Sequence, residues 1–123
     1  MFSSKIYLNK SEYKNNVDFI RKIIGKKPIF SSVVKGNAYG HGIREFVPMA
    51  ESCGVNHFSV FSQEEARLVK KFSKNNPTIM IMGVVSLEKI NWVVKNDVEF
   101  FVFNLTRLKA ALRHAKKLTS SQP

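Results

Sequence analysis

Apolar residues are distributed along the chain in two alternating patterns. In the first, they recur at every third or fourth position, which is the spacing of a helix with one buried face. In the second, they form short unbroken runs, which are typical of strands buried on both faces of a parallel sheet. Such runs predict strands at residues 29–34, 57–61, 78–82 and 99–103.

Helical spacing occupies the segments around and between these runs. The first helix is predicted behind Asn9, which forms a capping box with Glu12, and it ends at Gly25. A second is predicted over residues 43–52, where Pro48 is expected to shorten or kink it. Three more begin behind candidate capping residues, which are Ser62 with Glu65, Ser86 and Asn104. The polar residues 119–123 are expected to be disordered.

A helix between each pair of strands makes this an α/β chain of about four parallel β/α units. A complete (β/α)8 barrel needs eight strands and about 250 residues. The chain has 123 residues, so we expect a partial (β/α)8 TIM barrel belonging to a longer protein. Its first and fourth strands would then be open edges.

Composition indicates a globular protein, with 44% hydrophobic and 24% charged residues. No stretch approaches the roughly 20 apolar residues of a membrane span, and residues 1–10 lack the apolar core of a secretory signal. Cys53 is the one cysteine and cannot pair within the chain. We therefore expect a cytoplasmic protein with no membrane anchor, and we predict no metal site.

The net charge of +11 raises the question of nucleic-acid binding. The lysines, however, occur singly or in pairs, with no dense basic run and no aromatic RNA-recognition signature. A solvated outer face of lysine-rich helices is the favoured interpretation, so nucleic acid is not the expected partner. A basic, non-enzymatic α/β binding module remains an alternative, and its binding would weaken steeply with salt.

Candidate chemistry is concentrated where the first strand ends. Its apolar run stops at Lys35, and the glycine-rich segment 36–42 follows before the next helix. Ligands of parallel α/β folds bind at this end of the strands. A partly desolvated lysine there can form a Schiff base with a carbonyl, and the Tyr39 phenol can donate a hydrogen bond to a phosphate oxygen. The glycine spacing fits neither a dinucleotide nor a Walker motif.

Residues 33–42, Val-Val-Lys-Gly-Asn-Ala-Tyr-Gly-His-Gly, resemble the pyridoxal-phosphate attachment motif of bacterial alanine racemases. Gly36 stands where that family often has alanine. The resemblance implies that residues 1–123 form the N-terminal part of the pyridoxal-phosphate-binding barrel domain, with the remaining barrel and the C-terminal β domain absent. It also implies that Lys35 carries the cofactor and acts as one of two catalytic bases. Tyr39 would contact the cofactor phosphate and Val33 would line the cofactor cavity, while Met82 would lie near the ring or simply belong to the core.

The same resemblance implies interconversion of L-alanine and D-alanine, which supplies D-alanine for peptidoglycan, and a homodimer for the full-length protein. The opposite base would be a tyrosine from the partner's C-terminal domain. The arginine facing the pyridine nitrogen would lie on a later strand, so little or no racemization is expected of the 123 residues alone. An alternative with the same cofactor is a barrel enzyme that acts on a different amino acid.

Overall fold

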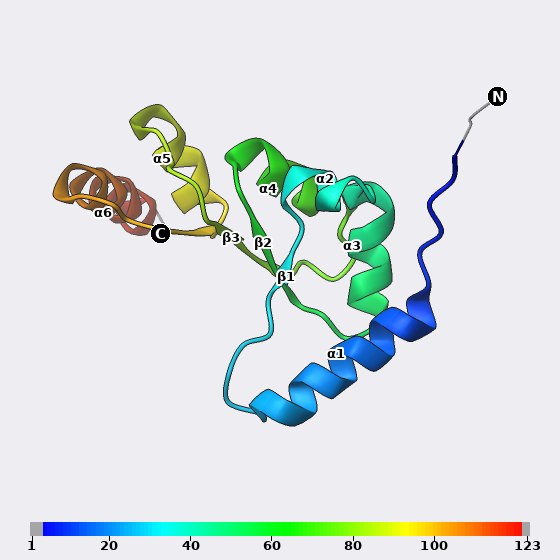
Figure 1. Ribbon diagram of the computed structural model, residues 1–123. Coiled ribbons are helices and arrows are strands. Elements are labelled where there is room, and N and C mark those ends of the chain that lie inside the picture. The colour runs from blue at the N-terminus through cyan, green and yellow to red at the C-terminus, as the bar shows by residue number, and fades with distance from the viewer. Residues whose placement is uncertain (1–3, 122–123) are drawn as a thin grey trace.

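A computed structural model describes residues 4–121 and contains one parallel sheet (Figure 1). Its strands are β1 (Ser32–Val33), β2 (His57–Val60), β3 (Thr78–Ile81) and β4 (Glu99–Phe100). Each strand pairs in parallel with the next in the order β1-β2-β3-β4. The predicted α/β class and its four parallel units are confirmed.

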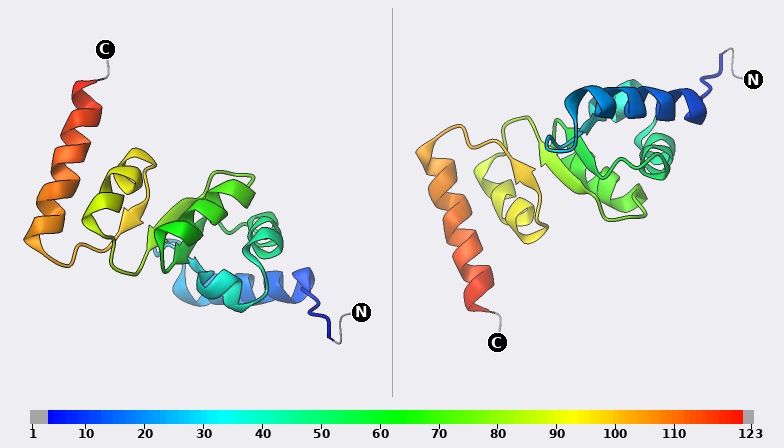
Figure 2. Two further views of the ribbon diagram at one scale, coloured as in Figure 1. Left: turned by 90° about the horizontal axis from the view of Figure 1, so that it is seen from above. Right: turned by 90° about the horizontal axis from the view of Figure 1, so that it is seen from below.

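Helices precede, connect and follow the strands. They are α1 (Lys10–Ile24), α2 (Lys35–Tyr39), α3 (Ile43–Ser52), α4 (Gln63–Phe72), α5 (Leu87–Lys95) and α6 (Leu105–Ser120). Figure 2 shows α5 and α6 side by side at one end of the sheet and α1, α2 and α3 grouped at the other. Helix α1 packs against α3 and helix α6 packs against α5, while α4 lies directly against β2 and β3.

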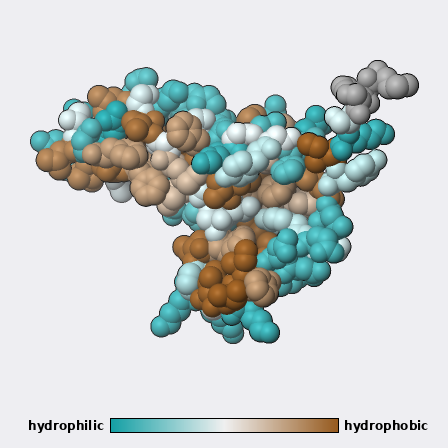
Figure 3. Space-filling model, in the orientation of Figure 1, coloured by the Kyte–Doolittle hydropathy of each residue, from teal (hydrophilic) through white to brown (hydrophobic). Residues whose placement is uncertain are grey.

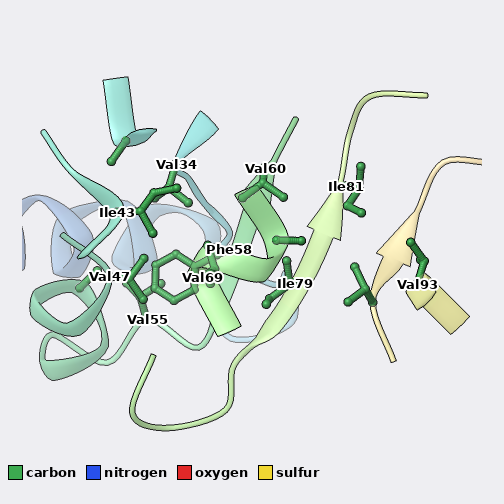
Figure 4. Packing of buried hydrophobic residues seen from close by; sticks show 14 of the residues in the cluster. Val34, Ile43, Val47, Val55, Phe58, Val60, Val69, Ile79, Ile81 and Val93 are labelled. Carbon is green, nitrogen blue, oxygen red and sulfur yellow. The ribbon is translucent and has the colours of Figure 1, made fainter. Parts of the chain in front are cut away.

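The core lies between the sheet and these helices (Figure 4). Alternate strand residues point to the same face. Five apolar residues on the helix side are at most 2% exposed: Val34, Phe58, Val60, Ile79 and Ile81. They pack against apolar side chains of the helices and loops, among them Ile43, Val47, Val55, Val69 and Val93. This burial fixes the sheet's register, because a slip by one residue would turn each apolar side chain to the other face.

The opposite face of the sheet carries a buried polar network that the sequence patterns did not reveal. The His57 ring is hydrogen-bonded through Nδ1 to Ser31 Oγ at 2.7 Å and through Nε2 to Glu99 Oε2 at 3.0 Å. Ser31 Oγ also lies 2.6 Å from Ser59 Oγ. These bonds join residues of the β1, β2 and β4 segments across the sheet, which satisfies the polar atoms that the fold buries there.

Three predicted helix caps are confirmed. Backbone N–H groups three residues ahead donate to Asn9 Oδ1 at 3.2 Å, to Ser62 Oγ at 3.3 Å and to Asn104 Oδ1 at 3.0 Å. The fourth, Ser86, precedes α5 but makes no side-chain cap bond. Its hydroxyl instead donates to Glu88 Oε1 at 2.6 Å, so Ser86 occupies the predicted N-cap position without making a capping hydrogen bond.

Both edge strands are shorter than the apolar runs predicted. β1 covers two residues of the predicted 29–34, and β4 covers two of 99–103. Each of these edge strands pairs with a neighbour on one side only. The apolar residues before β1 and after β4 therefore have no second strand to pair with, and they are not fully buried. Ile29 is accordingly 72% exposed and Phe101 is 50% exposed.

Two helices also differ from the prediction near their expected interruptions or ends. Helix α3 runs through Pro48 without interruption, because an internal proline removes one backbone bond that tertiary packing can offset. Helix α6 continues through Thr119 and Ser120. Their hydroxyls donate to the carbonyls of Ala115 and Lys116, each at 2.8 Å, which helps satisfy the last turn. The predicted disorder is wrong for residues 119 and 120, and residues 122–123 lie outside the described range.

Exposed apolar side chains gather in two places (Figure 3). One lies over the end of α1 and the segment leading to β1, where Ile23 and Ile29 are 68% and 72% exposed. The other follows β4, where Phe103 and Leu105 are 56% and 70% exposed. Within residues 4–121, none of the helices combines the length and apolar character needed to cross a membrane.

Replacing the central core residue Phe58 by alanine should lower the free energy of unfolding by about 3–5 kcal/mol. Phe58 is 0% exposed and lies in the middle of the sheet–helix interface. Phe19→Ala is the matched control, because Phe19 is 65% exposed, and its change should stay within about 0.5 kcal/mol. Urea unfolding followed by circular dichroism measures both. Equal effects of the two substitutions would contradict the core described above.

Candidate active site

Lys35 lies at the carboxyl edge of the sheet, immediately after the first strand. The N–H of Val34 donates to the carbonyl of Ser59 at 2.8 Å and extends the ladder one residue beyond β1. Lys35 is the next residue, and its side chain is exposed. Within residues 4–121, its amine takes part in none of the four ion pairs. A primary amine is therefore presented at the edge where parallel α/β folds bind their ligands.

The chain behind Lys35 forms a short left-handed helix, which is α2. Backbone φ and ψ are 60° and 42° at Gly36, 54° and 49° at Asn37, and 56° and 47° at Ala38. Tyr39 continues the run with φ of 53°. An L-residue in this conformation costs roughly 1–2 kcal/mol, and three of these four residues are not glycine. The sequence indicated the glycines of this turn, but it did not indicate that their neighbours share the conformation.

Local bonds hold the far half of this turn. The carbonyl of Asn37 accepts from the N–H of Gly42 at 2.9 Å, and its side-chain Oδ1 accepts from the N–H of Ile43, also at 2.9 Å. Asn37 thereby satisfies one of the free N–H groups in the first turn of α3, whose N-cap residue Gly42 provides no side-chain cap. Ala38 is 2% exposed and belongs to the core. The strained conformation is thus offset by burial and by satisfied backbone groups.

Glu65, from the first turn of α4, holds the near half. Its Oε1 accepts from the N–H of Gly36 at 2.7 Å and its Oε2 accepts from the N–H of Phe61 at 2.8 Å. In a capping box the carboxylate would instead reach back to the N–H of Ser62. The sequence therefore indicated the correct glutamate but the wrong partner. The carboxylate bridges the chain segments that leave β1 and β2.

The other predicted site residues lie on the same side of the sheet as Lys35 or close to it in the chain. Val33 is 38% exposed, on the face opposite the fully buried Val34. Met82 is half-buried directly after β3, and its N–H donates to the carbonyl of Val60 at 2.8 Å. Tyr39 ends the left-handed turn and is 63% exposed. Val33 and Met82 thus lie in or next to the strand ends at this edge, and Tyr39 ends the turn that follows the amine.

A hollow of about 420 Å³ lies at the opposite, amino-terminal edge. Its lining includes Phe30, Asn56, His57 and Thr78, which precede or open their strands, and none of the predicted site residues. An open sheet encloses no space at its carboxyl edge, because barrel closure is what creates that cup. The hollow therefore belongs to the other end of the sheet and not to the candidate site.

Two further groups near β1 are accounted for by packing. The exposed His41 ring stacks on Phe46 with centroids 6.5 Å apart. The Tyr13 hydroxyl is hydrogen-bonded to Ser32 Oγ at 3.0 Å. Burial raises the pKa of the Tyr13 phenol, and the bond to Ser32 partly opposes that shift. In the described part of the chain, no three His, Cys, Asp or Glu side chains group in a way that could hold a metal ion.

Comparison with known proteins gives consistent matches. The family model for the alanine racemase N-terminal domain matches residues 8–123. Alanine racemase 1 of Bacillus subtilis (strain 168) is 33% identical over 110 residues, which are 89% of this chain and 28% of that protein. The crystal structure of alanine racemase from Oenococcus oeni has 28% identity and a TM-score of 0.75, covering 85% of this chain and 28% of its own.

A second solved structure has lower sequence identity and is similar to this chain in fold alone. Alanine racemase from Bartonella henselae, crystallised with covalently bound pyridoxal phosphate, has a TM-score of 0.77 at 20% identity and covers 91% of this chain and 32% of its own. The chain thus spans less than a third of the length of these relatives. Their four-unit N-terminal segment and the sheet described above share one arrangement.

Gly36, which opens the left-handed turn, and Gly42, which lies after it, should respond differently to alanine. Gly36 lies in the small left-handed region that L-residues can enter, and an added Cβ there meets no atom within 4 Å. Gly42 has φ of 92° and ψ of 115°, outside that region. Gly36→Ala should therefore cost about 1–2 kcal/mol at most, and Gly42→Ala about 1–3 kcal/mol. Urea unfolding measures the order, and a larger loss for Gly36→Ala would contradict the backbone geometry.

Proposed function

Since the chain belongs to the alanine racemase N-terminal domain family, we propose that it carries the cofactor-attachment lysine of a pyridoxal-phosphate-dependent alanine racemase. One observation supports this most directly. Lys35 lies just beyond β1, at the carboxyl edge of the sheet, and its side chain is exposed. The left-handed turn that follows it is held by hydrogen bonds at its beginning and at its end. Residues 1–123 form, in this proposal, the N-terminal part of the cofactor-binding barrel domain.

The side chains at this edge fit the chemistry of that cofactor. A primary amine condenses with an aldehyde, a phenol donates a hydrogen bond to a phosphate oxygen, and apolar side chains cover a ring. We assign these roles to Lys35, to Tyr39, and to Val33 and Met82 respectively. A Cβ added at Gly36 or Gly40 would meet no atom within 4 Å, so the turn leaves room for a ligand beside its backbone.

Proton transfer at the substrate α-carbon is the step that this chain would catalyse. Pyridoxal phosphate, when bound, acts as an electron sink that stabilises negative charge on that carbon. The amine of Lys35 would remove or return the α-proton from one face of an alanine molecule. Inversion needs a second base on the opposite face, and the resemblance places that base outside these 123 residues. The cellular product would be D-alanine for peptidoglycan.

Lys35→Ala should abolish attachment of pyridoxal phosphate at this edge. The chain is incubated with the cofactor, reduced with borohydride and digested, and mass spectrometry locates the labelled lysine. In the unaltered chain, Lys35 should carry most of the label. Before reduction, the same chain should show a visible absorbance band, and Lys35→Ala should remove that band. The matched control is Lys27→Ala, which removes an exposed lysine at the opposite edge and should leave the band in place. Retention of the band in Lys35→Ala would refute the lysine assignment.

The 123-residue chain should move a proton without inverting the substrate. In D2O with pyridoxal phosphate, one enantiomer of alanine should exchange its α-proton, and racemization should stay near the rate of free cofactor. Proton NMR measures exchange, and chiral chromatography measures inversion. A panel of amino acids separates alanine from other substrates. Rapid inversion by this chain would contradict the assignment of a single base, and preference for another amino acid would replace alanine as the substrate.

A further inference from the structure

We infer that Glu65 is the positioning residue for Lys35, acting through the peptide bond that joins Lys35 to Gly36. This inference rests on the proposed function, because it gives Lys35 the cofactor-attachment role. Glu65 touches neither the amine nor any group assigned to the cofactor. Its effect would be to fix the direction in which the strand end presents the lysine.

The geometry of the carboxylate supports this role. Both oxygens are used, Oε1 by the N–H of Gly36 at 2.7 Å and Oε2 by the N–H of Phe61 at 2.8 Å. Hydrogen bonds from N–H groups to a charged acceptor are stronger than those to a neutral one. The helix that carries Glu65 is itself fixed, because the N–H of Glu65 donates to Ser62 Oγ at 3.3 Å and its neighbour Ala66 is 0% exposed. The helix that carries the acceptor is therefore anchored in the core, while Glu65 itself is half-buried.

The bonded peptide is the one that decides where the lysine lies. Left-handed backbone begins at Gly36, the residue directly after Lys35. A glycine at this position can also adopt right-handed and extended conformations at little cost, and each would give the peptide between Lys35 and Gly36 a different direction relative to the chain that follows. The bond from Gly36 to Glu65 selects one of these conformations. The second bond, from the N–H of Phe61, fixes the carboxylate relative to the sheet, because Phe61 directly follows strand β2.

The first test uses the free chain and needs no cofactor. Glu65→Gln keeps the length of the side chain but can accept from only one of the two N–H groups without placing its own NH2 against the other. Amide exchange measured by NMR should become about tenfold faster at Gly36, Phe61 or both. Core amides such as that of Ile79 should keep their protection. Glu65→Asp retains the charge but is one methylene shorter, so it should also fail to bridge the two groups.

The second test measures the lysine itself. After reaction with pyridoxal phosphate and reduction, the ratio of label on Lys35 to label on Lys27 should fall about tenfold in Glu65→Gln. The matched control is Glu64→Gln. Glu64 is the preceding residue on the same helix, and its hydrogen bond with Lys89 lowers its pKa, but it does not contact the turn. Its labelling ratio should equal that of the unaltered chain.

The outcomes separate this inference from the proposed function. Faster exchange at Gly36 together with a lower ratio at Lys35 supports the positioning role. An unchanged ratio in Glu65→Gln, with or without faster exchange, would overturn it and leave the attachment role of Lys35 intact. No preference for Lys35 over Lys27 in the unaltered chain would overturn the proposed function itself, and the positioning role with it. Loss of the folded state in Glu65→Gln moves the decision to Glu65→Asp, with the same two readouts.

Discussion

The left-handed turn behind Lys35 is the constraint on which the candidate site depends. The chain must leave a two-residue edge strand, present a lysine at the carboxyl edge of the sheet and enter α3 at Ile43. Left-handed backbone makes this reversal short, at a cost of roughly 1–2 kcal/mol for each non-glycine residue. Such a conformation persists only where its surroundings hold it. Asn37 holds one end through α3 and Glu65 holds the other through α4.

The sheet provides the frame for this turn by having two chemically different faces. Apolar side chains on one face pack beneath the helices, while Ser31, His57 and Glu99 form a polar network on the other. The first face sets register and stability. The second face ties strands together through hydrogen bonds between polar side chains. Because all strands are parallel, their carboxyl ends share an edge, and that edge receives Lys35 and Met82 from different strands.

Much of this could be predicted from the sequence because the relevant signals are local. The β/α order follows from hydrophobic spacing, and the caps at Asn9, Ser62 and Asn104 follow from residue types at fixed offsets. What could not be predicted depends on distant partners. The bond between Gly36 and Glu65 spans 29 residues, and the lengths of β1 and β4 depend on which neighbours they lack. The capping motif of Ser62 and Glu65 does not show that the Glu65 carboxylate also accepts a hydrogen bond from the distant Gly36.

The placement of the amine and the enclosure of a ligand are physically separate problems. The first is solved within about 30 residues, by β1, the turn and one carboxylate from α4. The second requires a closed wall, and an open parallel sheet cannot supply one at its carboxyl edge. Desolvation of a lysine depends on enclosure, whereas its direction depends on the backbone that carries it. The direction of Lys35 and the enclosure of a ligand should therefore have different structural requirements, and the proposed attachment of a cofactor at Lys35 depends on the first of them.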